Sequence, residues 1–320
     1  MSSDRGNVTL VGLAVNQQGR VSATTSIAAN GSIYLLARDT VAITSPNGSF
    51  VPTPTHGGTL TLGPSSVTSV LPDTSSAATA VDDQPQPQST LRFDGQQLEF
   101  SGGSQVIAPY GQLTVTANSD PDRSGLTAFK SDPGAQLRID SGALIDLSGS
   151  TASVPVTRNL VTVQLRANEL ADSPLQRDGP LRGATVVVDA RVGTPLANVS
   201  GEIALTQRGV LERTSNGGTA TFDSLGDVVL APGATINVSG GQVDYTPGLM
   251  QTTELVKSDG TLVDIGHASP LLSYQGILNP TFKSVFNQWG VTEIVPTPGI
   301  AHYDPGYVEG KSAGSVSFLM

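Results

Sequence analysis

The histidines of this sequence are the first candidates for chemistry, because histidine is the usual general base and a common metal ligand. His56, His267 and His302 lie far apart in the chain, and none is followed within four residues by another histidine or a cysteine. Zinc sites normally draw their ligands from such short spacings. We therefore expect three surface or loop histidines. The sequence also lacks the P-loop and the dinucleotide-binding motif, so no nucleotide cofactor is expected.

Carboxylates are the second candidates, since paired acids hydrolyse glycosidic bonds. Asp140 and Asp146 lie on neighbouring predicted strands, and Asn237 takes the place of Asp146 in a similar repeat. An acid that is an amide in the sister repeat favours a polar ladder on the solvent face over a catalytic pair. A loop also carries Asp120, Asp122 and Asp132. Their spacing lacks the glycine and glutamate of a calcium-binding EF-hand, so no metal site is predicted.

Aromatic residues are the third candidates, because exposed aromatic side chains often anchor partners. Seven of the fifteen aromatics fall between residues 243 and 307. They are Tyr245, Tyr274, Phe282, Phe286, Trp289, Tyr303 and Tyr307. We expect most of them to form the core of a small subdomain, in which the spacing within Phe282–Trp289 suggests a short helix. The candidate partner-binding residues are Tyr274, Trp289, Tyr303 and Tyr307.

Composition indicates an all-β chain. Of the 320 residues only 14% are charged, 36 are glycine and 21 are proline. Valine, threonine and isoleucine are plentiful, which favours short strands joined by tight turns. The formal net charge of −10 and the absence of a basic stripe argue against nucleic acid as a partner. Cysteine is absent, which is compatible with export of an unfolded chain.

A degenerate repeat runs along the sequence: a glycine-rich turn, then alternating apolar and polar residues, then another turn. The best pair is Gly142–Gly149, GALIDLSG, and Gly233–Gly240, GATINVSG. Period-two alternation places one set of side chains inward and the other in water. We expect Ile145 and Ile236 to point into the core.

Two architectures fit short strands with glycine turns. An antiparallel sandwich or barrel would show Asn-Gly or Asp-Gly hairpins, and Asn30-Gly31 and Asp94-Gly95 are such pairs. A solenoid instead requires like residues to stack on like in successive coils. The recurring phrase favours the solenoid, and the connections between strands are too short for helical crossovers.

Several segments interrupt the repeat. We predict β-helix coils over 1–242, with loop excursions near 63–90 and 118–133 and an atypical segment at 151–217 whose local charges brace a turn. The first excursion is rich in proline, serine and glutamine, a composition unsuited to a sheet. Residues 243–307 form an aromatic-rich insertion outside the helix, and 308–320 begin a further coil. Both termini resemble cuts through a longer repeat, and no signal peptide is visible.

The phrase NLVTVQLRANEL at Asn159–Leu170 resembles filamentous haemagglutinin-family exoproteins of two-partner secretion, as do Gly226–Gly241, Trp289–Glu293 and Gly306–Lys311. The resemblance extends over roughly 130–320. It implies a long right-handed parallel β-helix exported to the surface of a Gram-negative bacterium by an outer-membrane transporter. It also implies a role in adhesion, biofilm formation or contact-dependent competition. The family's N-terminal secretion domain is not present in this sequence.

The sequence therefore predicts a structural and adhesive shaft that is not an enzyme and has no cofactor. Its partner would be a host-cell or bacterial surface receptor or glycan. Two alternatives stay open. A β-helical carbohydrate-active enzyme would need a cleft with several charged side chains in reach of one sugar, and a passive spacer would bind nothing.

Overall fold

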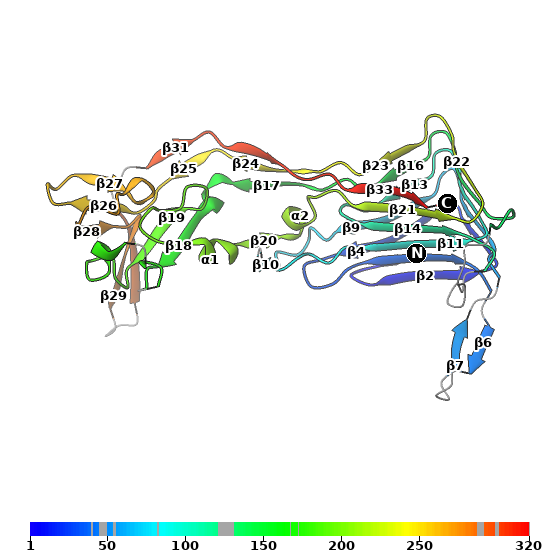
Figure 1. Ribbon diagram of the computed structural model, residues 1–320, viewed down its shortest axis with the longest axis horizontal. Coiled ribbons are helices and arrows are strands. Elements are labelled where there is room, and N and C mark those ends of the chain that lie inside the picture. Colours follow the sequence, from blue (N-terminus) through cyan, green and yellow to red (C-terminus); the bar gives the residue numbers. More distant parts are fainter. Residues whose placement is uncertain are drawn as a thin grey trace.

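The computed structural model describes residues 1–39, 41–44, 50–53, 56–81, 83–120, 131–166, 168–171, 173–286, 291–297 and 301–319. Within these ranges the chain is almost entirely β-structure (Figure 1). It has two parts: a stack of coils that contains both termini, and an arm that extends sideways from the stack. None of the described helices is long and apolar enough to cross a membrane.

The coils form three parallel sheets whose strands follow one another in rotation along the chain. Sheet A contains β1 (Ser2–Ser3), β4 (Arg20–Thr25), β9 (Val67–Pro72), β13 (Gln105–Ile107), β16 (Leu144–Asp146) and β23 (Thr235–Asn237). Sheet B contains β2 (Asn7–Gly12), β5 (Ser32–Ala37), β11 (Thr90–Gly95), β14 (Gln112–Ala117), β21 (Thr219–Ser224) and β33 (Ser315–Leu319). Sheet C contains β3 (Ala14–Gln17), β8 (Thr59–Leu62), β12 (Gln97–Phe100), β15 (Gln136–Ile139) and β22 (Asp227–Leu230). The chain is a parallel β-helix, as predicted.

The core consists of apolar ladders in which each residue lies on its equivalent in the next coil. One ladder of sheet B is Leu35, Phe93, Val115, Phe222 and Phe318, all in register. Ile145 pairs with Ile236 in sheet A, and Ile145 is fully buried. Ile236 is half-buried and packs against the same core, so the predicted inward orientation is confirmed. Burying each such side chain stabilises the fold by roughly 1.5–3 kcal/mol.

Glycine is required at the turn from sheet C to sheet A. Gly103, Gly142 and Gly233 occupy equivalent positions in successive coils, and each has a φ between 82° and 91°. Only glycine adopts this conformation without strain. The N–H of Gly103 donates to the carbonyl of Gly142, and the N–H of Gly142 donates to that of Gly233. The glycine that opens the repeated phrase is therefore a stacked turn residue.

Three excursions leave the helix at the same corner, after a strand of sheet A and before the next strand of sheet B. The shortest spans 73–89 and contains β10 (Thr79–Val81). The second lies between β16 and β21, with β17 (Thr151–Pro155), η1 (Val156–Asn159), β18 (Leu160–Gln164), η2 (Pro174–Gln176), β19 (Thr185–Asp189), α1 (Ser200–Ala204), β20 (Gln207–Gly209) and α2 (Val210–Arg213). The third lies between β23 and β33, with β24 (Gln242–Thr246), β25 (Gly248–Met250), β26 (Glu254–Lys257), β27 (Leu262–Asp264), η3 (Ile265–His267), β28 (Tyr274–Leu278), β29 (Thr281–Phe286), β30 (Val291–Pro296), β31 (His302–Asp304) and β32 (Tyr307–Gly310).

The second and third excursions together form the arm. β17 pairs in parallel with β24, which continues the stacking of the coils, and β32 returns antiparallel to β24. Beyond this root the pairs are antiparallel: β18 with β19, β26 with β27 and β28, and β25 with β31. Beyond the root, the arm has a buried apolar core made of Val163, Leu165, Leu170, Leu181, Val186, Val188, Leu196, Val199, Leu255, Ile265, Ala268 and Tyr274. A smaller buried cluster at the root consists of Ala152, Val156, Val243, Tyr245 and Met250. Residues 151–217 and 243–307 thus share a core.

Two sequence expectations are wrong in detail. Thr281–Phe286 is strand β29, paired antiparallel with β30, and is not a helix. A spacing of four residues fits one face of a strand as well as one face of a helix, which explains the error. The excursion predicted from residue 63 begins only after Pro72, because Val67–Pro72 is strand β9 and Val70 is buried in the core. The excursion near 118–133 does lie between β14 and β15, and its residues 121–130 are outside the described ranges.

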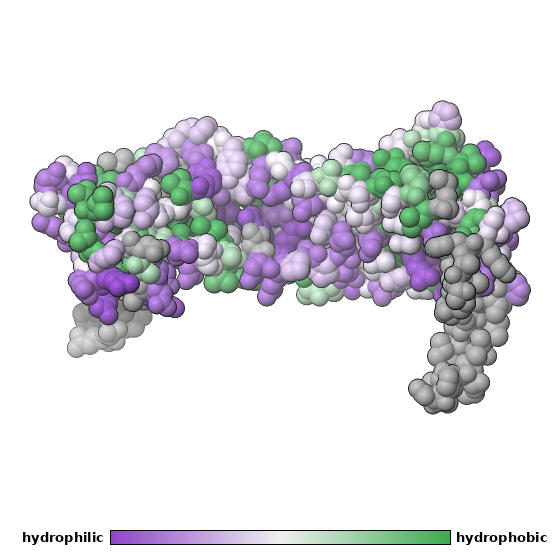
Figure 2. All heavy atoms as spheres, in the orientation of Figure 1, coloured by the Kyte–Doolittle hydropathy of each residue, from purple (hydrophilic) through white to green (hydrophobic). Residues whose placement is uncertain are grey.

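A hairpin, β6 (Val41–Thr44) with β7 (Phe50–Thr53), projects between β5 and β8 (Figure 1). Figure 2 shows hydrophobic residues gathered over the coils near the C-terminus and over the far part of the arm, with a largely hydrophilic surface between them. The first group includes Val229, Leu230, Val316, Phe318 and Leu319, which belong to the last strands of the stack. On the face that Figure 2 shows, the apolar residues therefore gather toward the two ends of the molecule.

Candidate functional site

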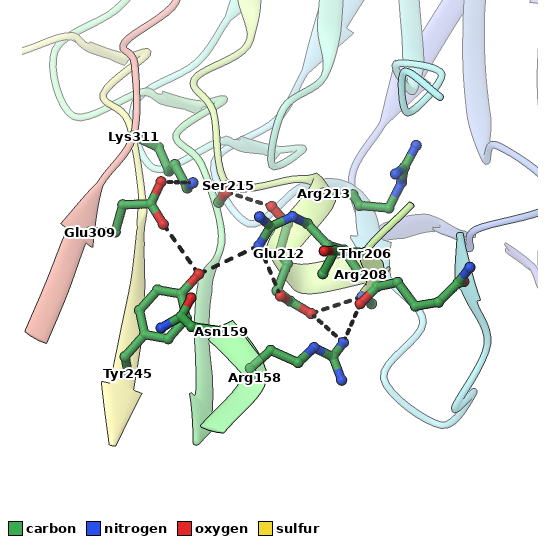
Figure 3. A network of polar contacts seen from close by, with 12 residues as sticks. Arg158, Asn159, Thr206, Arg208, Glu212, Arg213, Ser215, Tyr245, Glu309 and Lys311 are labelled. Atoms are coloured by element: carbon green, nitrogen blue, oxygen red, sulfur yellow. Dashed lines mark hydrogen bonds and ion pairs between the residues drawn. The ribbon is translucent and has the colours of Figure 1, made fainter. Parts of the chain in front are cut away.

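Glu212 is the centre of a polar cluster at the root of the arm (Figure 3). It lies on α2, and its carboxylate accepts the backbone N–H of Gly209 at 2.9 Å, which caps that helix. The same carboxylate lies 3.3 Å from an Arg158 Nη and 3.4 Å from an Arg208 Nη. Only 5% of the Glu212 side chain is exposed. A buried carboxylate between two guanidinium groups is stable only as an assembled unit, because each charge needs its partner.

The cluster continues into the third excursion. Arg208 also donates to the Tyr245 hydroxyl at 3.5 Å, and that hydroxyl donates to a Glu309 oxygen at 3.3 Å. Lys311 pairs with Glu309 at 2.5 Å. Figure 3 shows these groups converging from β20, α2, β24 and β32. Residues more than 90 positions apart are thus joined by one chain of polar contacts.

Arg213 extends the cluster to the first excursion. Its guanidinium donates to the carbonyl of Val81 at 2.7 Å, to the side-chain oxygen of Gln86 at 3.2 Å and to the carbonyl of Gln84. β10 pairs with β20 in the same region. We call this whole set of contacts the brace; it includes the contacts of Arg158, Arg208, Glu212, Arg213 and Lys311 described above. The charges of 151–217 therefore join the root of the arm to the two other excursions, whereas the sequence suggested only that they brace a turn.

A polar cavity of about 410 Å³ opens beside the brace, between the coils and the arm. Gln86, Tyr110, Arg213, Asn216 and Lys311 are among its lining residues. Tyr110 has a φ of 57°, a left-handed conformation that is uncommon outside glycine. Most of the charged groups here already have partners in the brace, so the geometry favours a structural joint.

A groove of about 850 Å³ lies in the arm. We call it the arm groove. Strands β18, β19, β28 and β30 and the start of β29 line it with Thr162, Thr185, Val187, Ile277, Leu278, Asn279, Thr281, Val295, Pro296 and Thr297. The lining combines aliphatic side chains with threonine hydroxyls and one carboxamide. An apolar surface with a few hydrogen-bonding groups is the usual character of a ligand site.

A third cavity, of about 350 Å³, also lies in the arm. We call it the acidic pocket. It is lined by Asp189, Val192, Gly193, Thr252, Glu254, Asp264, Gly266, His267 and His302. Asp189 binds Arg191 at 2.6 Å, and Asp264 accepts the backbone N–H of Gly266 at 2.7 Å and the hydroxyl of Thr252. The lining contains three acids and neither lysine nor arginine.

The four predicted partner-binding residues have different environments. Tyr274 is 4% exposed in the core of the arm, where its hydroxyl donates to the carbonyl of Ser269, so it is a core residue. Tyr307 stacks on Tyr245 with ring centroids 4.4 Å apart. Tyr303 is 66% exposed on β31 and is open to a partner. Trp289 lies outside the described residues. The structure does not gather these aromatics into one surface.

Tyr307 belongs to the framework of the arm. Arg191 lies over its ring, 5.3 Å from the centroid, and Asn159 donates to its hydroxyl at 3.1 Å. Burial raises the pKa of the Tyr307 hydroxyl above its ordinary value, an effect that the hydrogen bond with Asn159 opposes. The same Arg191 bridges Asp189 and Asp304, which joins β19 to β31.

The other chemical candidates are mostly structural. All three histidines are exposed, as expected, but His267 and His302 line the same acidic pocket, which their sequence spacing could not reveal. Asn237 donates to Asp146 at 3.1 Å across neighbouring coils, so the predicted polar ladder is confirmed. Asp140 follows strand β15 and is bound by Arg138 of that strand. Among the described residues, no cluster of three or more His, Asp or Glu side chains is arranged to hold a metal ion.

The sequence also contains a Gly-x-Ser-x-Gly motif at Gly310–Gly314, which marks the nucleophilic serine of many hydrolases. That motif works on a sharp turn between a strand and a helix. Here Ser312 lies in the extended connection between β32 and β33. The required context is absent, so the motif does not indicate a catalytic serine.

Sequence reasoning missed the arm groove and the acidic pocket. Comparison of the chain with protein-family models, with curated proteins and with solved structures gave no match. The resemblance to filamentous haemagglutinin-family exoproteins therefore rests on the residues quoted above.

Proposed function

We propose that this chain is a shaft segment of a large secreted bacterial surface protein, and that its arm contacts a receptor or glycan. The supporting observation is the division of the molecule. The coils form a continuous stack with a buried apolar core, and the arm carries a groove of about 850 Å³. The stiff stack would hold the arm away from the cell surface, and the arm would expose the contact site to a partner. Adhesion, biofilm formation and contact-dependent competition all need such a display.

The location follows from the same proposal. A chain of the filamentous haemagglutinin type would reach the surface of a Gram-negative bacterium through an outer-membrane transporter of two-partner secretion. The absence of cysteine fits this route, because no disulfide can form before export is complete. A transporter gene next to the gene for this chain would support the route. An operon in which the neighbouring genes encode cytoplasmic partners of this chain would contradict it.

The arm groove is the proposed contact site. Thr185 is exposed on β19 and lines the groove. Thr185→Arg places a long charged side chain across the opening without entering the core. Binding of the purified chain to epithelial cells, to bacterial cells and to a glycan array should fall by about tenfold or more, the equivalent of about 1.4 kcal/mol.

Thr9→Arg is the matched control, because Thr9 is an exposed strand residue of the coils. It should bind as well as the unaltered chain. Equal binding by both variants would refute the groove as the contact site. If the unaltered chain binds none of these targets, the chain is a passive spacer.

The enzyme alternative needs two free carboxylates around one substrate. The acidic pocket is the place to look, since Asp189, Glu254 and Asp264 all line it. However, Asp189 is engaged by Arg191 and Asp264 by Thr252 and Gly266. One uncommitted acid fits binding better than acid–base catalysis. Release of reducing sugar ends from a polysaccharide, lost in Glu254→Gln, would reverse this conclusion.

A further inference from the structure

Glu254 lines the acidic pocket, and its carboxylate has no partner among the described residues. It lies on β26, the central strand of the sheet formed with β27 and β28, and only 8% of the residue is exposed. Its Oε2 is fully buried without a hydrogen bond, and within the described residues its other oxygen has no hydrogen bond or ion pair. Carboxylates so deeply buried are almost always hydrogen-bonded or ion-paired, because removing the charge from water costs several kcal/mol. The side chain therefore lacks the donor that its position demands.

The surroundings define the missing donor. The two other acids of the pocket are already bonded, and the lining offers no lysine or arginine to Glu254. Thr252 and Asp264 bond to each other. The pocket is thus electronegative and rimmed by the exposed His267 and His302. The group that completes it should be positively charged and rich in N–H donors.

We infer that the acidic pocket binds a small ligand through a protonated primary amine, with the ammonium group on the Glu254 carboxylate. An ammonium group carries three donors and no acceptor, which suits a buried carboxylate beside further acids. The cavity of about 350 Å³ has room for an amino sugar or an alkylamine. A metal ion is the competing cation, but the described residues contain no group of three ligands arranged for one.

The acidic pocket and the arm groove share no lining residue. This inference therefore does not depend on the proposed adhesive contact. Loss of the contact in Thr185→Arg should leave amine binding intact.

The test is an NMR titration in which each probe is added to the full chain and the backbone amide chemical shifts are monitored. Butylamine at neutral pH is the charged probe and butanol its neutral counterpart of the same shape. We expect butylamine to shift amides of β26, β27 and η3 and to bind about tenfold or more tightly than butanol. Equal affinity for the two probes, or shifts spread over the whole chain, would overturn the inference.

Two variants locate the binding. Glu254→Gln keeps the shape and removes the charge, so butylamine affinity should fall by about tenfold or more. Val192→Lys, at an exposed rim position, supplies a tethered ammonium that competes for the same carboxylate and leaves the core untouched. It should also abolish butylamine binding. If Glu254→Gln fails to fold, Val192→Lys still decides the result.

Asp178→Asn is the matched control, because that carboxylate is 92% exposed in the arm away from the pocket lining. It should bind butylamine normally. Zinc and calcium chloride are titrated in parallel. If either metal binds saturably at the pocket and butylamine causes no shifts there, the ligand is a metal ion and the inference is refuted. Absence of butylamine binding would refute it as well.

Discussion

The coils and the arm bury apolar surface in opposite ways. In the coils every strand lies parallel and in register on an equivalent strand, so like residues stack on like. In the arm the pairs beyond the root are antiparallel, and the core joins two excursions that the chain reaches one coil apart. A stacked ladder can be extended by adding a repeat, whereas the arm must assemble complementary pieces. This difference explains why repeats mark the coils and none marks the arm.

The two regions also differ in how charges are used. In the coils, the exposed Arg138 pairs with Asp140 just beyond the end of β15, outside the apolar core. At the root of the arm, Glu212 is buried between guanidinium groups from separate segments. In the coils the buried Asp94 pairs with Arg92 of its own strand and Arg38 of the neighbouring coil, whereas the ion pairs at the root of the arm join segments that lie far apart in the chain. Each region should therefore fail through a different kind of substitution.

The largest effect is expected from a cavity in the coils. Phe93 is fully buried, with its ring 5.9 Å from that of Phe100. Phe93→Ala should lower the free energy of unfolding of the coils by about 3–5 kcal/mol, because it removes a large side chain from a stacked ladder. Urea unfolding measures this, and Tyr303→Ala at an exposed arm position should change it by less than about 0.5 kcal/mol. A change of similar size in both variants would contradict the ladder as the source of stability.

A smaller effect, confined to the other region, is expected from the brace. Glu212→Ala leaves Arg158 and Arg208 without their shared partner and should destabilise the root of the arm by roughly 2–3 kcal/mol. Hydrogen exchange should accelerate in β17, β20 and β24 and stay unchanged in β11 and β14.

The exposed pair of Asp178 and Arg182 provides the control for this prediction. Asp178→Ala should cost less than about 0.5 kcal/mol, because exposed ion pairs contribute little. Faster exchange throughout the coils in Glu212→Ala would show that the two regions unfold as one unit.

The smallest effect is a pH dependence of the arm. Arg191 donates to Asp304, and the N–H of Gly306 also donates to it, so the pKa of Asp304 lies below the ordinary value of 3.8. A carboxyl with a lowered folded pKa contributes stability above its unfolded pKa and loses it as the pH falls through the folded pKa. The link between β19 and β31 should therefore weaken below about pH 3.8. The midpoint temperature of thermal unfolding of the arm should fall less steeply between pH 7 and pH 2 in Asp304→Asn than in the unaltered chain. An unchanged slope would exclude this contribution.

Much of the coil architecture was predictable because it depends on local patterns. Alternation predicted that Ile145 points inward, and the repeated phrase predicted its alignment with Ile236. The polar ladder from Asp146 to Asn237 followed from the same alignment. In contrast, the spacing within Phe282–Trp289 fitted two periods, and the sequence could not choose between them. The strand β29 was decided by its pairing with β30.

The candidate sites were not predictable, since they depend on contacts between distant segments. Tyr274 looked like a surface aromatic, but the first half of the arm covers it. Glu254 carries no sequence signal, because its missing partner is a property of the residues folded around it. His267 and His302 meet at one pocket only because β31 pairs with β25 and η3 follows β27.

The sequence by itself determined that this chain stacks as a parallel β-helix, because each coil repeats the apolar alternation and the glycine turn that the next coil needs. The tertiary structure alone decided that three separate interruptions leave one corner and that two of them form a single arm. The reason is physical: stacking is an interaction between similar neighbours and is written into the repeat, whereas the arm depends on complementary surfaces that meet only after the coils have aligned them.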